Sequence, residues 1–190
     1  EDISWEPAGT SKDTRLDGWL KKRAVENGDW QKALKYAENQ FWARPTVEGY
    51  SELKALAEQL GNWPDSQQEI LTHLTQKEEY GLLTRMYLLE NDVETALETL
   101  PKVRFGGNLA IDVAKAAEKT HPRQALNIYQ QIVERLITAR GRDNYVQAAE
   151  YLKRVQALYM QMDQPEDWGG YIQGIRNQKP RLPALLDELE

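Results

Sequence analysis

Apolar side chains recur at helical spacing between residues 30 and 43. The recurring positions are Trp30, Ala33, Leu34, Ala37 and Phe41. Separations of three and four residues put them on one face of an α-helix. Asp29 is a suitable N-cap, because its short carboxylate can accept a hydrogen bond from an amide in the first turn. Pro45 is expected to end the helix, since the residue before a proline is pushed out of the helical region.

A second helix is predicted directly after the first. Thr46 can cap it, and Gly61 is expected to end it, because glycine readily takes the left-handed conformation that closes helices. The apolar positions of its buried face are Tyr50, Leu53, Ala57 and Leu60. Two helices joined by two or three residues must run antiparallel. Residues 29–61 are therefore predicted to form a helical hairpin.

Similar helix starts recur toward the C-terminus. The first is either Asp65, in a capping box with Gln68, or Ser66, in a capping box with Glu69. The others are Asp92, Asn108, His121–Pro122, Asp143, and Asp163 in a capping box with Glu166. A partner helix is expected near residues 77–90, and Gly141 is expected to end the helix that begins at Pro122.

Four helix starts share an alanine four residues after a capping-type residue. The pairs are Asp29 with Ala33, Asp92 with Ala96, His121 with Ala125, and Asn144 with Ala148. A small side chain there lets one helix approach its partner closely. The alanine intervals of 63, 29 and 23 residues are irregular, whereas a strict tetratricopeptide array repeats about every 34 residues. We predict an all-α fold of about five antiparallel hairpins, stacked right-handedly as a tetratricopeptide-like α-solenoid. Residues 12–190 are expected to form this single domain, preceded by a loosely ordered leader over residues 1–11.

Composition narrows the class of protein. Hydrophobic residues make up 41% and charged residues 28% of the 190 positions, and cysteine is absent. The sequence contains no apolar run near the roughly 20 residues that span a bilayer, so no membrane partner is expected. A chain without disulfides or a signal sequence is expected to be cytoplasmic. Because the sequence opens at Glu1 rather than at Met, we expect a fragment of a longer protein.

No catalytic or cofactor-binding constellation is evident in the sequence. The two histidines, His73 and His121, lack a metal-ligand partner at helical spacing, and both are interpreted as structural. The glycines of "RFGGN" (104–108) and "GGYIQG" (169–174) lack the lysine and hydroxyl residue of a phosphate-binding loop. The sequence therefore predicts no enzyme, no metal, no cofactor and no small-molecule substrate.

Three tryptophans follow turn-type residue pairs. Trp30, Trp63 and Trp168 come after Gly-Asp, Gly-Asn and Glu-Asp. We interpret them as structural aromatics that wedge between helices while the indole N–H reaches a loop carbonyl.

Basic residues are concentrated in one part of an otherwise acidic chain. The net charge of the whole is −6, but residues 112–160 carry eight basic and five acidic side chains. On the helix from residue 143, the buried stripe is expected to contain Tyr145, Ala148, Ala149, Leu152, Val155 and Tyr159. A hairpin would bring the other basic residues alongside it, giving a hypothetical patch of Arg123, Arg135, Arg140, Arg142, Lys153 and Arg154. An acidic partner or a phosphate backbone would suit such a patch. The alternative is internal pairing with Glu134, Asp143 and Glu150.

The C-terminal part resembles a known family. The segments "YVQAAEYLKRVQALY" (145–159) and "DWGGYIQGIRNQKPRLPALLDELE" (167–190) resemble the C-terminal tail of bacterial SWIM zinc-finger proteins. The preceding "HPRQALNIYQQIVERLI" (121–137) fits the same tail, whereas residues 28–120 agree only in their hairpin pattern. The zinc module of that family needs a C-x-C…C-x-H ligand set, so any zinc site would lie upstream of this cysteine-free sequence. Gly169 and Gly170 interrupt the tryptophan helix, which is expected to fray or to pack unusually closely against a neighbour.

The function expected from these features is a non-catalytic helical interaction module. It would hold a protein partner or another region of its own full-length chain. The alternative is an accessory nucleic-acid-binding surface, built on the basic stretch of residues 112–160 and working with an upstream zinc finger.

Overall fold

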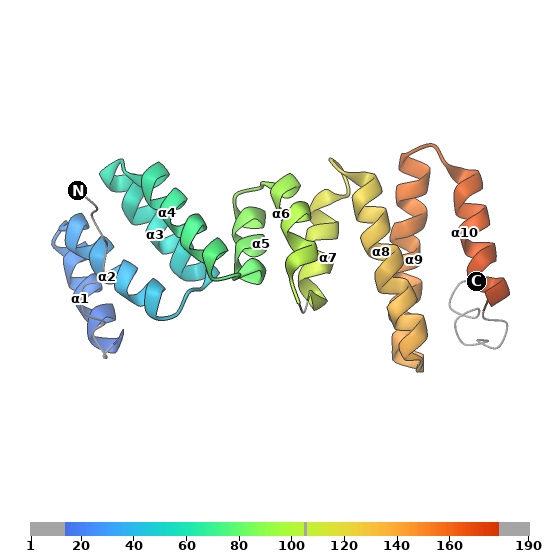
Figure 1. The fold of residues 1–190 in the computed structure, drawn as a ribbon, viewed down its shortest axis with the longest axis horizontal. Helices are drawn as coiled ribbons and strands as arrows, with labels where there is room; N and C mark the ends of the chain where they lie inside the picture. Colours follow the sequence, from blue (N-terminus) through green and yellow to red (C-terminus); the bar gives the residue numbers. More distant parts are fainter. Residues whose placement is uncertain (1–13, 105, 179–190) are drawn as a thin grey trace. The chain divides into compact units, whose positions relative to one another are not determined.

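The computed structural model describes residues 14–104 and 106–178, with side chains described over residues 16–104 and 106–177. Every regular element in these ranges is a helix, which confirms the predicted all-α class (Figure 1). The chain divides into two compact units, Glu1–Leu89 and Glu90–Glu190. The expectation of one domain over residues 12–190 stays a prediction. The predicted leader, residues 1–11, lies outside the described residues.

The described residues of the first unit, 14–89, form five helices. They are α1 (Thr14–Glu26), α2 (Trp30–Ala43), α3 (Val47–Leu60), α4 (Trp63–Gln76) and α5 (Tyr80–Leu89). Each helix packs against the next one in sequence. Phe41, Tyr50 and Leu74 lie at the centre of the core that these helices enclose, and each is at most 1% exposed.

The predicted hairpin of α2 and α3 is present with its caps. The Asp29 carboxylate accepts a hydrogen bond from the Lys32 amide, and the Thr46 hydroxyl accepts one from the Gly49 amide. Helix α2 stops at Ala43, two residues before Pro45. Gly61 closes α3 with a left-handed φ of 73°.

In the second unit, residues 90–104 and 106–178 form five α-helices and one short 3₁₀ helix. They are α6 (Val93–Thr99), the 3₁₀ helix η1 (Leu100–Lys102), α7 (Gly107–Ala117), α8 (Pro122–Ala139), α9 (Arg142–Gln161) and α10 (Pro165–Gln178). Helices α8 and α9 form the most extensive pair, α7 packs on α8, and α10 packs on α9. The predicted buried stripe of α9 is confirmed, with Leu158 as an additional member.

Besides the start of α10, which begins at Pro165 while the expected cap Asp163 lies in the preceding turn with φ of 57°, three predicted helix boundaries are wrong. Helix α4 begins at Trp63 rather than after Asp65 or Ser66, because Pro64 sets a helical backbone angle in its first turn. Helix α7 begins at Gly107, before the expected cap Asn108, since the Gly106 carbonyl already accepts from the Ala110 amide.

The third correction concerns the turn between α8 and α9. Helix α8 ends at Ala139, and the residue that follows it is Arg140 rather than Gly141; both have a positive φ, of 58° and 100°. Gly141 instead precedes the first residue of α9, which begins at Arg142, one residue before Asp143. The Asn144 side-chain amide donates to the Arg140 carbonyl across this turn.

Four helix junctions share one backbone turn. A left-handed residue follows each helix, and the next amide donates to the carbonyl five residues earlier, as in a Schellman motif. The left-handed residues are Gly28, Gly61, Glu78 and Asp163, with φ of 72°, 73°, 57° and 57°. The corresponding donors are Asp29, Asn62, Glu79 and Gln164. The chain therefore repeats one turn geometry, although the residue in the left-handed position differs between the turns.

The predicted close approach at the four alanines is supported by their burial. Ala33, Ala96, Ala125 and Ala148 are all 0% exposed.

Candidate binding groove

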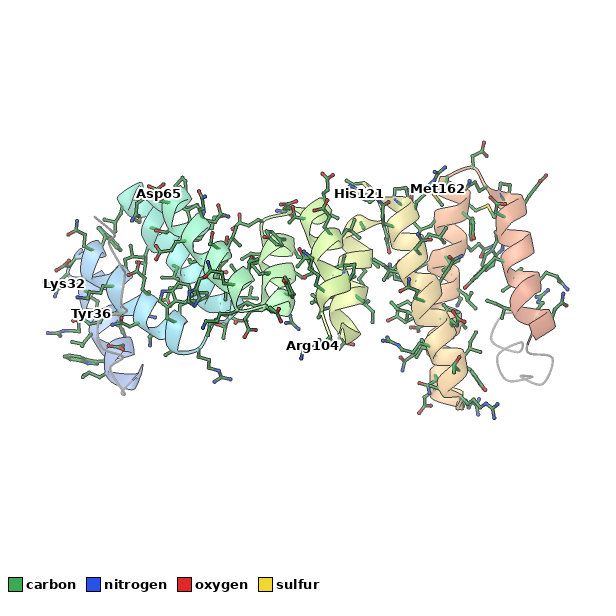
Figure 2. All side chains as sticks on the ribbon, in the orientation of Figure 1. Lys32, Tyr36, Asp65, Arg104, His121 and Met162 are labelled. Atoms are coloured by element: carbon green, nitrogen blue, oxygen red, sulfur yellow. The ribbon has the colours of Figure 1, made fainter. Side chains whose placement is uncertain are left out.

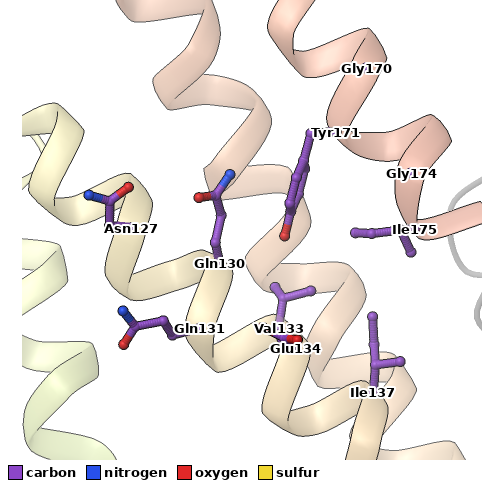
Figure 3. A pocket seen from close by; sticks show the side chains of 10 residues that line it. All are labelled: Asn127, Gln130, Gln131, Val133, Glu134, Ile137, Gly170, Tyr171, Gly174 and Ile175. Atoms are coloured by element: carbon purple, nitrogen blue, oxygen red, sulfur yellow. The ribbon is translucent and has the colours of Figure 1, made fainter. Parts of the chain in front are cut away.

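An open groove of about 570 Å³ lies between α8 and α10 in the second unit. Its volume falls within the range of about 300–1,000 Å³ that is usual for ligand sites. The residues that line it are Asn127, Gln130, Gln131, Val133, Glu134 and Ile137 from α8, and Gly170, Tyr171, Gly174 and Ile175 from α10 (Figure 3). It was not anticipated from the sequence.

The apolar floor of the groove follows from the amphipathic pattern of α10. Trp168, Tyr171, Ile172 and Ile175 recur at helical spacing and pack, partly buried, on the core of α8 and α9. Tyr171 points from α10 toward α8, where Val133 and Ile137 face α10 (Figure 3). The rings of Tyr159, Trp168 and Tyr171 lie 6.2–6.3 Å apart and hold α10 in place.

Glycines keep the α10 side of the groove open. Helix α10 runs without a break through Gly169, Gly170 and Gly174. A Cβ atom added at any of the three would meet nothing within 4 Å. The expected close packing at Gly169 and Gly170 is therefore wrong, because there is room for a side chain at both positions. At Gly170 and Gly174 the missing side chains leave space that forms part of the groove.

The polar lining of the groove consists of amides, one carboxylate and the Tyr171 hydroxyl. The Gln130 amide donates to the Tyr159 hydroxyl at 3.0 Å, which fixes that side chain. Burial, together with Tyr159 and Glu134, raises the pKa of the Tyr171 hydroxyl to about 12. Tyr171 therefore stays a neutral hydrogen-bonding group at physiological pH.

A separate polar cluster lies around Glu118, at the end of α7. Its carboxylate accepts from the Tyr129 hydroxyl at 2.7 Å and from the Arg154 guanidinium at 2.6 Å. Arg154 also lies 5.9 Å from the centre of the Tyr129 ring. The Gln161 side chain donates to the Glu118 carbonyl. This cluster ties α7 to both α8 and α9.

The six residues of the hypothetical basic patch are all exposed, but they do not form one cluster. Arg123 and Arg140 are at opposite ends of α8, and 17 residues at 1.5 Å each place them roughly 25 Å apart. Arg142 lies with Arg140 at the junction of α8 and α9, and Arg135 lies on α8 five residues before Arg140. Lys153 lies on α9 beside Arg154, which is paired with Glu118. The internal partner of Arg154 is Glu118, which was not among the three acidic residues considered from the sequence.

The three tryptophans have different environments. Trp63 is 9% exposed and packs edge-on against Tyr50 at 5.2 Å between ring centres. Trp168 is half-buried in the ring cluster of α10. Trp30 is 37% exposed and differs from the expected wedge, because it occupies the first position of α2 and is not in the buried set of that helix.

The two histidines have different surroundings. His73 packs on the Trp42 ring at 4.7 Å, and His121 precedes α8 with its Nδ1 2.9 Å from the Thr120 hydroxyl. Within residues 14–104 and 106–178, no three His, Asp or Glu side chains gather in a way that could hold a metal ion. In the same ranges no helix has the length and apolar character needed to cross a membrane. Figure 2 shows how widely polar and charged side chains are distributed over these helices.

Comparison with known proteins gives one informative similarity. No protein-family model matches the chain. The chain is 32% identical over 76 residues to the uncharacterized protein YwqB of Bacillus subtilis (strain 168). The similar stretch covers 40% of this chain and 14% of that protein. The chain therefore corresponds to only a small part of the relative's length.

Proposed function

We propose that this chain is a non-catalytic helical interaction module that holds a protein partner or another region of its own full-length chain. The observation that supports this proposal is the groove between α8 and α10, which combines an apolar floor with amide side chains. Such a lining suits a polypeptide, which presents apolar side chains and main-chain hydrogen-bonding groups together.

The proposal includes an architecture, a family and a location. The hairpins would stack as a tetratricopeptide-like α-solenoid, a kind of array that commonly offers binding surfaces along its length. The resemblance over residues 120–190 favours the C-terminal region of a bacterial SWIM zinc-finger protein that acts in the cytoplasm. Any zinc would then belong to an upstream region.

A nucleic-acid-binding surface is the second candidate. It would use the exposed basic side chains Arg135, Arg140, Arg142 and Lys153 of the 112–160 stretch, beside an upstream zinc finger. Phosphate contacts release counterions, so the affinity of such a surface would fall steeply as salt rises. Partner binding in the α8–α10 groove would depend much less on salt.

A pull-down with the full-length chain, with and without nuclease, tests the two candidates. The proposed function predicts a protein partner that is retained after nuclease treatment and at raised salt. Retention that disappears with nuclease would favour the second candidate and contradict the first.

A charge-reversal variant further distinguishes protein binding from nucleic-acid binding. Changing Arg140, Arg142 and Lys153 to Glu should leave protein binding unchanged and abolish any nucleic-acid binding. Arg154 is kept in this variant, because reversing it would place two carboxylates against each other at Glu118. The thermal midpoint should then change little, since exposed charges contribute about 0–1 kcal/mol each.

A further inference from the structure

The polar side chains along α8 have a spacing that suits an extended polypeptide. Asn127 and Gln131 are four residues apart, which is about 6 Å along the helix. Main-chain groups that face the same side of an extended chain repeat every two residues, at about 6.7 Å. A primary amide carries both a donor and an acceptor, as a peptide unit does. Gln131 points away from α10, on the rim of the groove (Figure 3).

These two amides have no hydrogen-bonding partner within the described residues. A main chain that lies against the groove loses water and needs replacement partners for its N–H and C=O groups. Asn127 and Gln131 can supply them without losing an internal bond. Gln130 differs, because one of its amide hydrogens is already given to Tyr159.

The charge of the groove selects one kind of side chain. Glu134 is the sole charged residue among the ten that line it, and no ion pair involves Glu134 within the part of the chain that is described. A basic side chain would neutralise this carboxylate, whereas a phosphate group would be repelled by it. The adjacent floor of Val133, Ile137 and Ile175 suits an apolar side chain next to the basic one.

We infer that the groove between α8 and α10 binds an extended segment of a partner protein, with its main chain along Asn127 and Gln131 and a lysine or arginine at Glu134. This inference rests on the proposed function and gives it a site and a ligand chemistry. Gly170 and Gly174 leave the α10 side free for the segment's apolar side chains.

A displayed library of random linear peptides, selected against the 190-residue chain, tests the inference. We expect selected sequences to share a basic residue beside an apolar one. Their affinity is then measured by fluorescence anisotropy against the chain and against three variants, Gly174→Leu, Gly169→Leu and Glu134→Gln.

The two leucine variants form a matched pair. Both positions are on α10 and have room for a Cβ atom, but only Gly174 lines the groove. Both should raise helix stability similarly, since leucine is a much better helix former than glycine. Gly174→Leu should weaken peptide binding about tenfold or more, and Gly169→Leu should leave it unchanged. Glu134→Gln should weaken binding by about tenfold for peptides with lysine or arginine, and not for peptides in which norleucine replaces that residue.

Several outcomes would overturn the inference. Peptides that bind Gly174→Leu as tightly as the unchanged chain would place the site elsewhere and leave the proposed function standing. A library that gives no binder would reject the groove as a peptide site, while the full-length pull-down still decides the proposed function. A synthetic peptide of residues 178–190 that binds the groove more tightly than any selected peptide would replace the external partner with the chain's own segment.

Discussion

At the scale of single residues, small side chains determine how closely the helices pack. Ala148 on α9 is completely buried against α8, in the core cluster that contains Val133 and Leu152. A larger side chain there would push the two helices apart, because protein cores are close-packed and leave little free volume. Ala157 on the same helix is exposed and has no such constraint.

The first prediction compares these two alanines. Ala148→Leu should lower the free energy of unfolding by about 1–3 kcal/mol through overpacking. Ala157→Leu should change it by less than about 0.5 kcal/mol, as expected for surface substitutions. Urea denaturation followed by far-UV circular dichroism measures both. Equal stability of the two variants would show that the close packing of α8 on α9 does not depend on the small side chain of Ala148.

A second residue-scale feature is a half-buried carboxylate in the first unit. Glu38 on α2 lies in a small cavity lined by Leu34, Trp42, Leu53, Ser66, Glu69 and Ile70. Burial, followed by the nearby charge of Glu69, raises the pKa of Glu38, and Lys35 opposes the shift. Between the ordinary pKa and the raised one, the folded state binds more protons than the unfolded state. Stability from this group is therefore present at low pH and is lost as pH rises through the raised pKa.

The second prediction follows from this loss of stability as pH rises. Glu38→Gln should increase the thermal midpoint at pH 7, because the glutamine has no charge to desolvate. The increase should shrink as pH falls, and it should disappear below the ordinary value of 4.5. Thermal denaturation between pH 4 and pH 8 measures it, with Glu58→Gln on the exposed face of α3 as the control. A stabilisation that is independent of pH would contradict this account.

At the scale of elements, the repeated turn uses glycine at two junctions and a larger residue at two others. Gly61 and Glu78 have nearly the same role, with φ of 73° and 57°. The left-handed conformation costs a residue with a Cβ atom about 1–2 kcal/mol. The turn after α4 therefore carries strain that the turn after α3 does not.

The third prediction exchanges the two residue types. Gly61→Ala should destabilise the chain by about 1–2 kcal/mol, all of it from the backbone, because a Cβ there meets nothing within 4 Å. Glu78→Gly should instead be neutral or stabilising by up to about 1 kcal/mol, since the relieved strain exceeds the added entropy of the unfolded chain. Chemical denaturation of both variants measures whether their free energies of unfolding change in opposite directions. A loss of stability in Glu78→Gly would mean that the Glu78 side chain contributes more than its backbone costs.

The elements also show which features a sequence can predict. Caps such as Asp29 and Thr46 were predicted correctly because donor and acceptor are three residues apart. The groove was not predicted, because it forms between helices that are separated by all of α9. The pairing of Arg154 with Glu118, 36 residues away, was missed for the same reason. The sequence predicts no helix at the position of α1, where the large apolar residue Trp19 is 58% exposed instead of buried.

At the scale of the whole molecule, the chain has separate cores in its two units. One core contains buried residues from Ala24 to Met86, and the others contain buried residues from Ala114 to Tyr159. A unit that encloses its own core can in principle fold alone.

The fourth prediction tests that independence. A fragment of residues 90–190 should be helical by far-UV circular dichroism and should unfold cooperatively. Hydrogen exchange should show protection of α8 and α9 similar to that in the complete chain. A fragment that is unfolded, or protected only when residues 1–89 are added, would support the single domain expected from the sequence.

Within each unit, the packing of helices on their neighbours in sequence has a consequence for synthesis. Contacts between neighbours need only short loops to close, and chains with such local contacts fold quickly. The ribosome adds about 5–20 residues per second, which is slow compared with the packing of two adjacent helices. Each helix of the first unit can therefore pack on its predecessor soon after it leaves the ribosome, before α10 has been translated.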